Sequence, residues 1–213
     1  MAKDPRNRLL SRGPRIRLNA EQLRDQILAV SDALNPVMYG PSVQPLRPAG
    51  TDQFRFGDAF KLSNPENQHR RSLYTYVKRT NPFPNQITFD GTDRTTCASR
   101  RIRTNTPLQA LALLNDPVYM EAAQAIGYYM DTLAVENELD RLKMGYQKVL
   151  LRTPDAAKLQ DLFTLYTDAK KHYQKEPVLT SKLVAQQTTQ KEELAALTMV
   201  AHALLNLDEF VNN

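Results

Sequence analysis

Residues 106–133 read TPLQALALLNDPVYMEAAQAIGYYMDTL and contain two helix starts of the same kind. Thr106 can cap a helix in which Pro107 takes the first position and Gln109 the third. Asp116, which a proline also follows, repeats the device. After it, apolar residues recur at helical spacing and mark one face of the second helix: Val118, Ala122, Ile126, Tyr129 and Leu133. The stretch therefore predicts two consecutive helices.

The helical pattern continues to the C-terminus. Residues 136–152 carry apolar side chains at helical spacing, and Thr153, with the proline after it, begins another helix that runs to about Lys175. A last helix is predicted from about Gln190. Because short connections between helices favour antiparallel neighbours, residues 106–213 are expected to form a helical bundle.

The N-terminal half is less regular. Residues 1–18 are predicted to be a basic arm, because they carry six basic side chains and one acidic one. Asn19, with Gln22 three residues later, resembles a capping box that begins a helix over residues 19–35. Residues 36–105 are expected to form an irregular arm that contains one short strand and an arginine-rich loop.

The short strand is predicted at residues 71–79. There Leu73, Thr75 and Val77 alternate with a serine and two tyrosines, and this period of two, in β-favouring residues, is typical of a strand. A lone strand needs a partner, so pairing with the arm or with residues 86–89 is expected. The chain is thus predicted to be mainly α, with a C-terminal antiparallel helical bundle, an irregular N-terminal arm and one short β element.

Length and composition are those of an ordinary globular protein. The chain has 213 residues, of which 41% are hydrophobic and 24% charged, and this length favours a single domain over residues 1–213. The longest apolar runs fall well short of the roughly 20 residues that cross a bilayer, so no membrane span is expected. The first residues lead directly into charged ones, so no secretory signal is expected in this stretch. The single cysteine, Cys97, excludes an internal disulfide, a four-cysteine zinc site and a covalent haem attachment motif.

The net charge of +5 is unevenly distributed. Residues 1–18 and 67–105 carry charges of +5 and +6, whereas residues 19–66 and 106–213 carry −2 and −4. These segments can therefore pair with one another across the fold. Basic segments near tyrosines also raise nucleic-acid binding as a hypothesis. Since no nucleic-acid motif is present and the acidic C-terminal half would repel a duplex, nucleic acid is not the expected partner.

The arginine-rich loop, residues 89–105, lies directly ahead of Thr106 and is the sharpest candidate site. A helix start offers unpaired N–H groups and the positive end of a dipole, and arginines beside it can help to hold a sulfate, phosphate or carboxylate. The alternative is that the arginines bind backbone carbonyls and the chain's own acids, such as Glu121, and only fix the loop. The candidate anion-binding residues are Arg94, Arg100, Arg101, Arg103, Asn105 and Thr106.

Two aspartates in the same segment suggest a second candidate site. Asp90 and Asp93 could line a cleft as a general acid and base, or could bind a hard cation. Their spacing alone establishes neither role, and a turn around Gly91 is the preferred explanation. Because the sequence contains no known catalytic motif, no catalytic residue is assigned.

Cysteine and histidine give no further candidate site. Cys97 lies among arginines that favour a reactive thiolate, but free cysteines are usually buried, so the expected role is that of a small buried hydrophobe. His69, His172 and His202 form no metal-binding pattern, since none of them pairs with another at helical spacing. No metal site is therefore predicted.

Two longer stretches carry a family resemblance. Residues 70–79, RRSLYTYVKR, and residues 101–111, RIRTNTPLQAL, resemble the planctomycete-type, cytochrome-c-associated domain of unknown function. Shorter matches support the resemblance along nearly the whole chain, at residues 4–10, 20–25, 39–43, 115–117 and 204–209. Family members begin this domain well upstream of Asp4, so the chain resembles the C-terminal part of that domain.

The resemblance implies a place in a larger exported protein. In such a protein a cytochrome c domain and a second uncharacterised domain precede this one. Haem is therefore expected on a separate domain of the parent protein, with no cofactor in this chain, and the expected location is the periplasm or cell envelope. The expected partners are the preceding domains and an anionic glycan, because bacteria with this family are rich in machinery for sulfated polysaccharides. The family has no established reaction, so the resemblance supplies no catalytic residues.

The sequence and the resemblance together suggest two alternative functions. The first is a non-catalytic binding or scaffolding module that docks the cytochrome-bearing part or an anionic ligand. The second is part of a carbohydrate-active enzyme for sulfated polysaccharides, in which Asp90, Asp93 and the arginines line a cleft. The enzyme requires both carboxylates to open into a concave pocket, whereas the scaffold predicts that they are locked in ion pairs.

Overall fold

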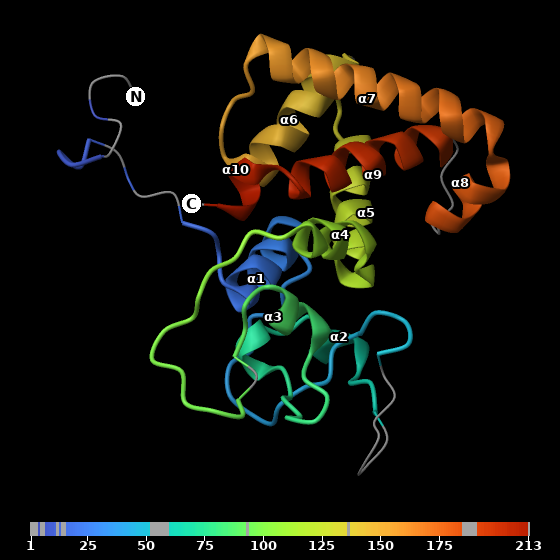
Figure 1. Ribbon diagram of the computed structural model, residues 1–213. Helices are drawn as coiled ribbons and strands as arrows, with labels where there is room; N and C mark the ends of the chain where they lie inside the picture. The colour runs from blue at the N-terminus through green and yellow to red at the C-terminus, as the bar shows by residue number, and fades with distance from the viewer. Residues whose placement is uncertain are drawn as a thin grey trace.

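Figure 1 shows a mainly helical fold, for which the computed structural model describes residues 4–212 except residues 5–6, 12, 14–15, 52–59, 93, 136 and 185–190. The predicted fold class, mainly α with a helical bundle, is confirmed. The α-helices are α1 (Ala20–Val30), α2 (Pro65–Gln68), α3 (Pro84–Thr88), α4 (Pro107–Asn115), α5 (Pro117–Asp131), α6 (Glu138–Leu150), α7 (Ala156–Lys175), α8 (Pro177–Leu183), α9 (Lys191–Leu205) and α10 (Asp208–Val211). A 3₁₀ helix at Ser72–Tyr74 lies between α2 and α3. None of the helices in the described ranges is both long enough and apolar enough to span a bilayer.

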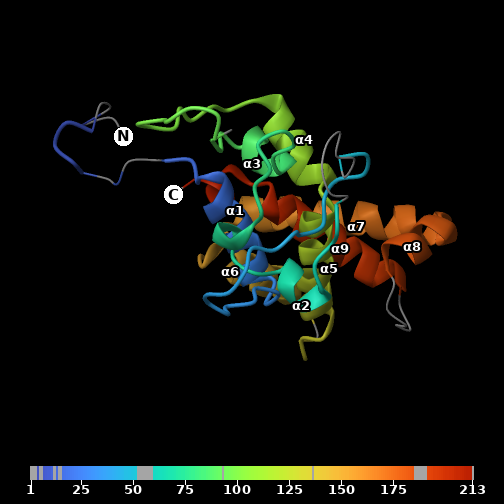
Figure 2. The same cartoon turned by 90° about the horizontal axis from the view of Figure 1, so that it is seen from below.

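The bundle is built around α9. This helix packs against α5 and α7, and both views of the ribbon show α7 beside it (Figures 1 and 2). From Leu194 to Leu205 nearly every residue of α9 is buried, as expected for a helix that is apolar on all sides. On α5, Gly127 allows the close approach, because a Cβ atom there would lie 2.7 Å from Thr198 Oγ1 of α9. One hydrophobic cluster continues from the bundle into α1.

Three of the helices begin with the predicted capping devices, and in α1 the Asn19 N–H donates to Gln22 Oε1 over 3.1 Å. The Gln109 N–H donates to Thr106 Oγ1 over 3.4 Å, and the Thr106 N–H donates to Gln109 Oε1 over 3.3 Å, which closes the start of α4. Asp116 caps α5 by accepting hydrogen bonds from the N–H groups of Val118 and Tyr119. These local signals sufficed because a cap satisfies N–H groups within the same few residues.

α1 and α7 each have one boundary that differs from the prediction for a local reason. α1 ends at Val30, five residues short of the predicted end, because Asp32 adopts a left-handed conformation with a φ of 60°. α7 begins two residues after the predicted start. Its cap is Asp155, whose carboxylate accepts a hydrogen bond from the Lys158 N–H over 2.8 Å.

The strand predicted at residues 71–79 is wrong. The 3₁₀ helix takes its place, and Thr75 alone of these residues pairs, in an isolated parallel bridge with Val43 of the arm. The alternation misleads at its start, where Ser72 is buried and Leu73 is 75% exposed, although Thr75 is buried as the alternation predicts. Local periodicity therefore did not reveal which face of this segment meets the core.

The irregular arm is more structured than predicted. α2 and α3 lie within it, and each has proline at its first position, the same device that begins α4. α3 includes residues 86–88, which belong to the segment considered as a strand partner. Between the helices, isolated bridges hold the arm together, and one of them joins Asn35 to Arg70. Figure 1 shows this part below the bundle, where α1 and α3 lie close to α4.

Candidate anion-binding site

The arginine-rich loop is tied to α1 by one ion pair. Arg101 donates from Nη1 to Glu21 Oε2 over 2.6 Å and from Nη2 to Glu21 Oε1 over 2.8 Å, although the two residues are 80 positions apart. This hydrogen bonding lowers the pKa of Glu21, against the desolvation that would raise it. Arg101 therefore neutralises an acid of the chain itself and anchors the loop to the first turn of α1.

Stability in acid is expected to depend on this pair. Because the pKa of Glu21 in the folded state lies below its unfolded value of about 4.3, the stabilisation is present above that pH and is lost as the pH falls through the folded-state pKa. We expect about 0.5 to 1 kcal/mol, since both side chains are partly screened by solvent. In urea unfolding, Glu21→Gln should be less stable than the wild type at pH 7 and should converge with it toward pH 3. A difference that stays constant with pH would contradict this role.

Asp90 is bound within the loop. Its Oδ2 accepts from the Thr104 N–H over 2.8 Å, and its Oδ1 accepts from Thr104 Oγ1 over 2.7 Å. Gln109 Nε2 adds a longer hydrogen bond of 3.4 Å to Oδ2. Both carboxylate oxygens are thus occupied, by neutral donors rather than by the ion pairs that the scaffold hypothesis predicts. Asp93, the second candidate carboxylate, lies outside the described residues.

The residues at the start of α4 make hydrogen bonds with neighbouring residues of the chain. Gln109 is fully buried, where its Nε2 donates to Thr104 Oγ1 over 3.1 Å while its Oε1 accepts from the Thr106 N–H. Asn105 Oδ1 accepts from Arg17 Nη1 over 3.1 Å. Asn105 and Thr106 therefore both make hydrogen bonds within the chain.

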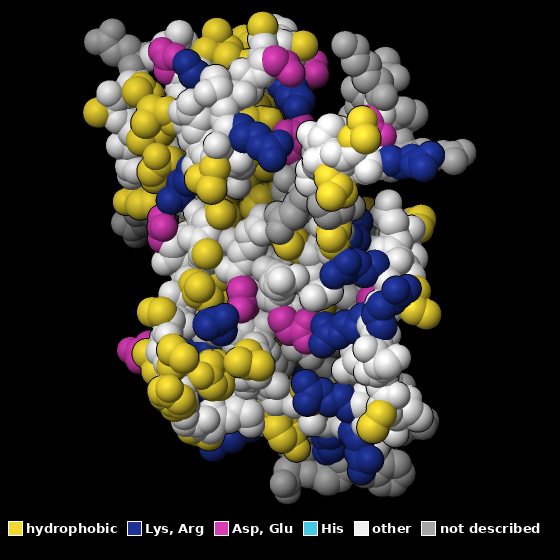
Figure 3. All heavy atoms as spheres, turned by 90° about the vertical axis from the view of Figure 1, so that its left-hand side faces the viewer, with side chains coloured by type: hydrophobic (Ala, Val, Ile, Leu, Met, Phe, Trp, Pro, Cys, Tyr) yellow, Lys and Arg dark blue, Asp and Glu magenta, His cyan; other side chains and the backbone are white. Residues whose placement is uncertain are grey.

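A hollow beside α1 gathers three of the predicted arginines. Arg100, Arg101 and Arg103 line this space of about 570 Å³ together with Asn19, the residue that precedes the first turn of α1, and Ile102. Arg100 and Arg103 are exposed, and neither makes a hydrogen bond or ion pair to any residue that the structure describes. Lys and Arg side chains gather along one side of the face shown in Figure 3. Three of the predicted arginines therefore also lie beside the start of α1, which the sequence did not indicate.

A second hollow of about 370 Å³ shares Arg103 with the first. Arg17 and Asn105 line it together with Asp208 and Asn212, two residues near the C-terminus. Arg94 lines neither hollow but contributes by its charge to the lowered pKa of Glu21. Of the four predicted arginines, three therefore meet at one place and the fourth acts on it at longer range.

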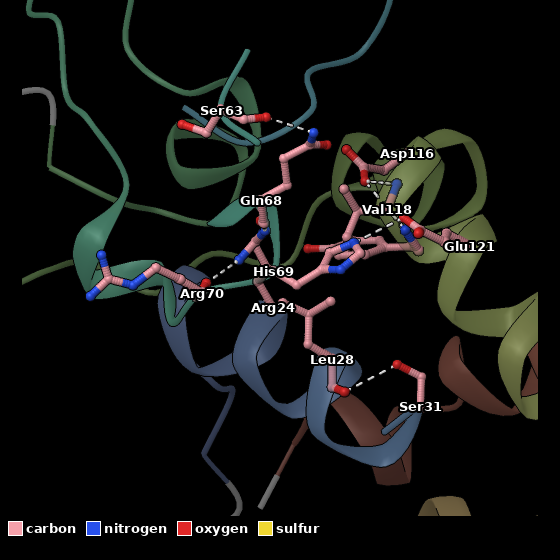
Figure 4. A network of polar contacts seen from close by, with 11 residues as sticks. Arg24, Leu28, Ser31, Ser63, Gln68, His69, Arg70, Asp116, Val118 and Glu121 are labelled. Carbon is pink, nitrogen blue, oxygen red and sulfur yellow. Dashed lines mark hydrogen bonds and ion pairs between the residues drawn. The ribbon is translucent and has the colours of Figure 1, made fainter. Parts of the chain in front are cut away.

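Two buried arginines, which the sequence did not single out, organise the arm. Arg24 extends from α1 and donates to the Gln68 carbonyl over 2.6 Å and to the Arg70 carbonyl over 3.0 Å (Figure 4). A longer hydrogen bond of 3.4 Å reaches Ser72 Oγ. Burial lowers the pKa of Arg24, with nearby acidic groups opposing this. No sequence signal marked this residue, because arginine is rarely buried without a carboxylate partner.

Arg70 continues the network toward the protein surface. Its guanidinium donates to the carbonyls of Pro41 over 3.2 Å, of Val37 over 3.1 Å and of Tyr39. It also lies 4.0 Å from the centre of the Tyr74 ring. One buried side chain thus fixes a turn in which Tyr39 adopts a left-handed conformation.

The family model for a protein of unknown function (DUF1553), also called PSD1, matches residues 1–166. The chain belongs to this family. The match covers α1, the buried arginines, the arginine-rich loop and the hollow, and it ends within α7. No curated protein and no solved structure matches the chain.

Cysteine and histidine form no metal centre in the described part of this DUF1553 chain, where no three His, Cys, Asp or Glu side chains lie together to hold an ion. Cys97 is exposed, so its predicted burial is wrong. It belongs to the arginine-rich loop, which runs outside the core. His69 Nε2 lies 3.1 Å from Glu121 Oε2 (Figure 4). His202 is buried with Nε2 3.2 Å from the Leu113 carbonyl, and burial lowers its pKa.

Proposed function

We propose that the chain is a non-catalytic binding module that holds anionic groups in the hollow beside α1. The observation that carries the proposal is the pair Arg100 and Arg103. Both line the hollow, and neither has a partner among the described residues. Guanidinium groups present a planar fork of donors that matches sulfate and carboxylate oxygens. Between them, Arg101 is fixed by Glu21 and so holds the loop in place.

The electrostatic environment supports an anionic ligand. The loop contributes Arg94, Arg100, Arg101 and Arg103, and the acid that opposes them at the start of α1 is Glu21. The start of α1 adds the positive end of the helix dipole, while its first N–H groups are engaged in the Asn19–Gln22 capping box. A sulfate or carboxylate placed there would therefore meet a net positive field.

Binding is favoured over catalysis because of Asp90. A carbohydrate-active enzyme for sulfated polysaccharides would need carboxylates that are open to substrate. Both oxygens of Asp90 are occupied by Thr104 and Gln109. The enzyme alternative therefore draws no support from this residue.

The module is further proposed to work within a larger exported protein. The resemblance of residues 70–79 and 101–111 to the planctomycete-type, cytochrome-c-associated domain supports this, and DUF1553 membership agrees with a domain of unknown function. Haem would then lie on a separate preceding domain, in the periplasm or cell envelope. The anionic group would come from a sulfated glycan or from a preceding domain. The absorbance spectrum of the parent protein tests this part, since a parent without c-type haem would contradict it.

Replacing the two unpartnered arginines is expected to abolish most of the anion affinity. In calorimetric titrations with a sulfated hexasaccharide, the double variant Arg100→Gln/Arg103→Gln should bind at least about tenfold more weakly than the wild type. Its free energy of unfolding should change by less than about 0.5 kcal/mol, because both side chains are exposed.

The control is Arg152→Gln, which removes one positive charge from an exposed arginine between α6 and α7. It should leave the affinity unchanged. The unsulfated hexasaccharide should give no heat with any of the proteins. Equal heats of binding in the double variant and the wild type would overturn the proposal.

A further inference from the structure

The outer face of α4 is apolar and lacks a covering element in the part of the chain that the structure describes. Leu108, Leu111 and Leu114 are 59%, 55% and 46% exposed, while Gln109 and Leu113 face the core. α4 contains no charged residue. A helix that is apolar on all sides is normally buried, and a contiguous exposed apolar surface marks an interaction site. We propose that this face docks an acidic amphipathic helix of a partner protein.

The spacing of the three leucines indicates that the occupant is a helix. Leu108, Leu111 and Leu114 follow one another at intervals of three, so they form a single ridge of the kind that packs into the groove of a second helix. Recognition of an amphipathic helix through such anchors is a recurring binding mode. Ile87 on α3, the helix that packs beside α4, is also exposed.

The charge around α4 indicates that the occupant is acidic. The arginine-rich loop leads directly into α4, and both ribbon views show it running from α3 to the start of α4 (Figures 1 and 2). Residues 67–105 have a charge of +6, with Arg100 and Arg103 exposed. A second copy of the chain would bring two such basic segments together, which is unfavourable. Glutamates beside an apolar seam would instead complement them.

A membrane surface fits the α4 face less well than a partner helix does. Helices that lie on membranes carry Lys or Arg beside their apolar face, whereas α4 has none and turns its polar Gln109 inward. The chain also has no tryptophan, which commonly anchors such helices at the interface. A protein helix is therefore the occupant that both the ridge and the charge favour.

A synthetic peptide can test this inference. The probe is an amphipathic peptide of about 20 residues, long enough to form a helix, with a leucine seam, glutamates elsewhere and one tryptophan. Because the chain has no tryptophan, peptide fluorescence reports binding directly. The acidic peptide should bind at least tenfold more tightly than a twin in which every glutamate is lysine. Leu111→Glu and Leu108→Glu should each weaken binding at least tenfold.

The matched control is Leu179→Glu on α8, a leucine of similar exposure outside the proposed surface. It should bind like the wild type, and circular dichroism melts should show that all variants are folded. Equal affinity for the two peptides, or normal binding by both α4 variants, would overturn the inference. Binding to phosphatidylglycerol vesicles in place of the acidic peptide would also overturn it, in favour of a membrane surface. Loss of anion binding in the Arg100→Gln/Arg103→Gln variant is a separate result and does not decide this one.

Discussion

Replacing Arg24 by methionine is expected to lower the free energy of unfolding by about 3 kcal/mol. Methionine keeps the packing of the side-chain stem but removes the donors to the carbonyls of Gln68 and Arg70 and to Ser72 Oγ. These acceptors lie in the segment that holds α1 against the arm, so they would lose their partners in a largely buried place. Urea unfolding followed by circular dichroism measures the change.

Arg71→Met is the control for this prediction. Arg71 is the neighbouring arginine, its side chain is about half exposed, and its Nε lies 3.8 Å from Asp25 Oδ2. Such a surface ion pair contributes little, so a loss below about 1 kcal/mol is expected. If Arg24→Met were no more damaging than Arg71→Met, the buried network would not stabilise the arm as described.

Replacing Gln109 by leucine is expected to lower the free energy of unfolding by about 2 to 3 kcal/mol, the second large effect. Leucine fills a similar volume, but it leaves the Thr106 N–H and the Thr88 carbonyl without the partners that Gln109 provides. It also removes a donor from Thr104 Oγ1 and from Asp90. The end of the arginine-rich loop would then be held less firmly, so the Thr104 amide should exchange hydrogen faster.

The control is Gln147→Leu, because Gln147 makes a single side-chain hydrogen bond, at the surface, to Thr153 Oγ1. The free energy of unfolding of this variant should fall by less than about 0.5 kcal/mol. Equal stability of the two glutamine variants, with unchanged exchange at Thr104, would show that Gln109 does not organise the loop.

The helix starts of the C-terminal half could be predicted from the sequence because their causes are local. Thr106 and Asp116 satisfy N–H groups within three residues of themselves, and a proline follows each one. The structure of residues 71–79, by contrast, could not be predicted from local signals. The side chains alternate, but the burial of Ser72 depends on α1, from which Arg24 and Asp25 reach it.

The arginines of the candidate site could be predicted from the sequence, but their position beside α1 could not. The sequence pointed to the cluster of arginines, and Arg100, Arg101 and Arg103 do line one hollow. It placed the cluster ahead of α4 because α4 follows in the chain. The pair of Arg101 with Glu21, 80 residues away, turns the loop toward α1. No local pattern reports a contact of that sequence separation.

The α1 hollow is tested most directly by locating an anion in it. Crystals soaked in sodium selenate, which has the shape and charge of sulfate and scatters anomalously, would show where anions bind. We expect an anomalous peak within hydrogen-bonding distance of the guanidinium groups of Arg100 and Arg103, beside Asn19. Peaks confined to other parts of the molecule, with this hollow empty at a concentration that fills them, would contradict it.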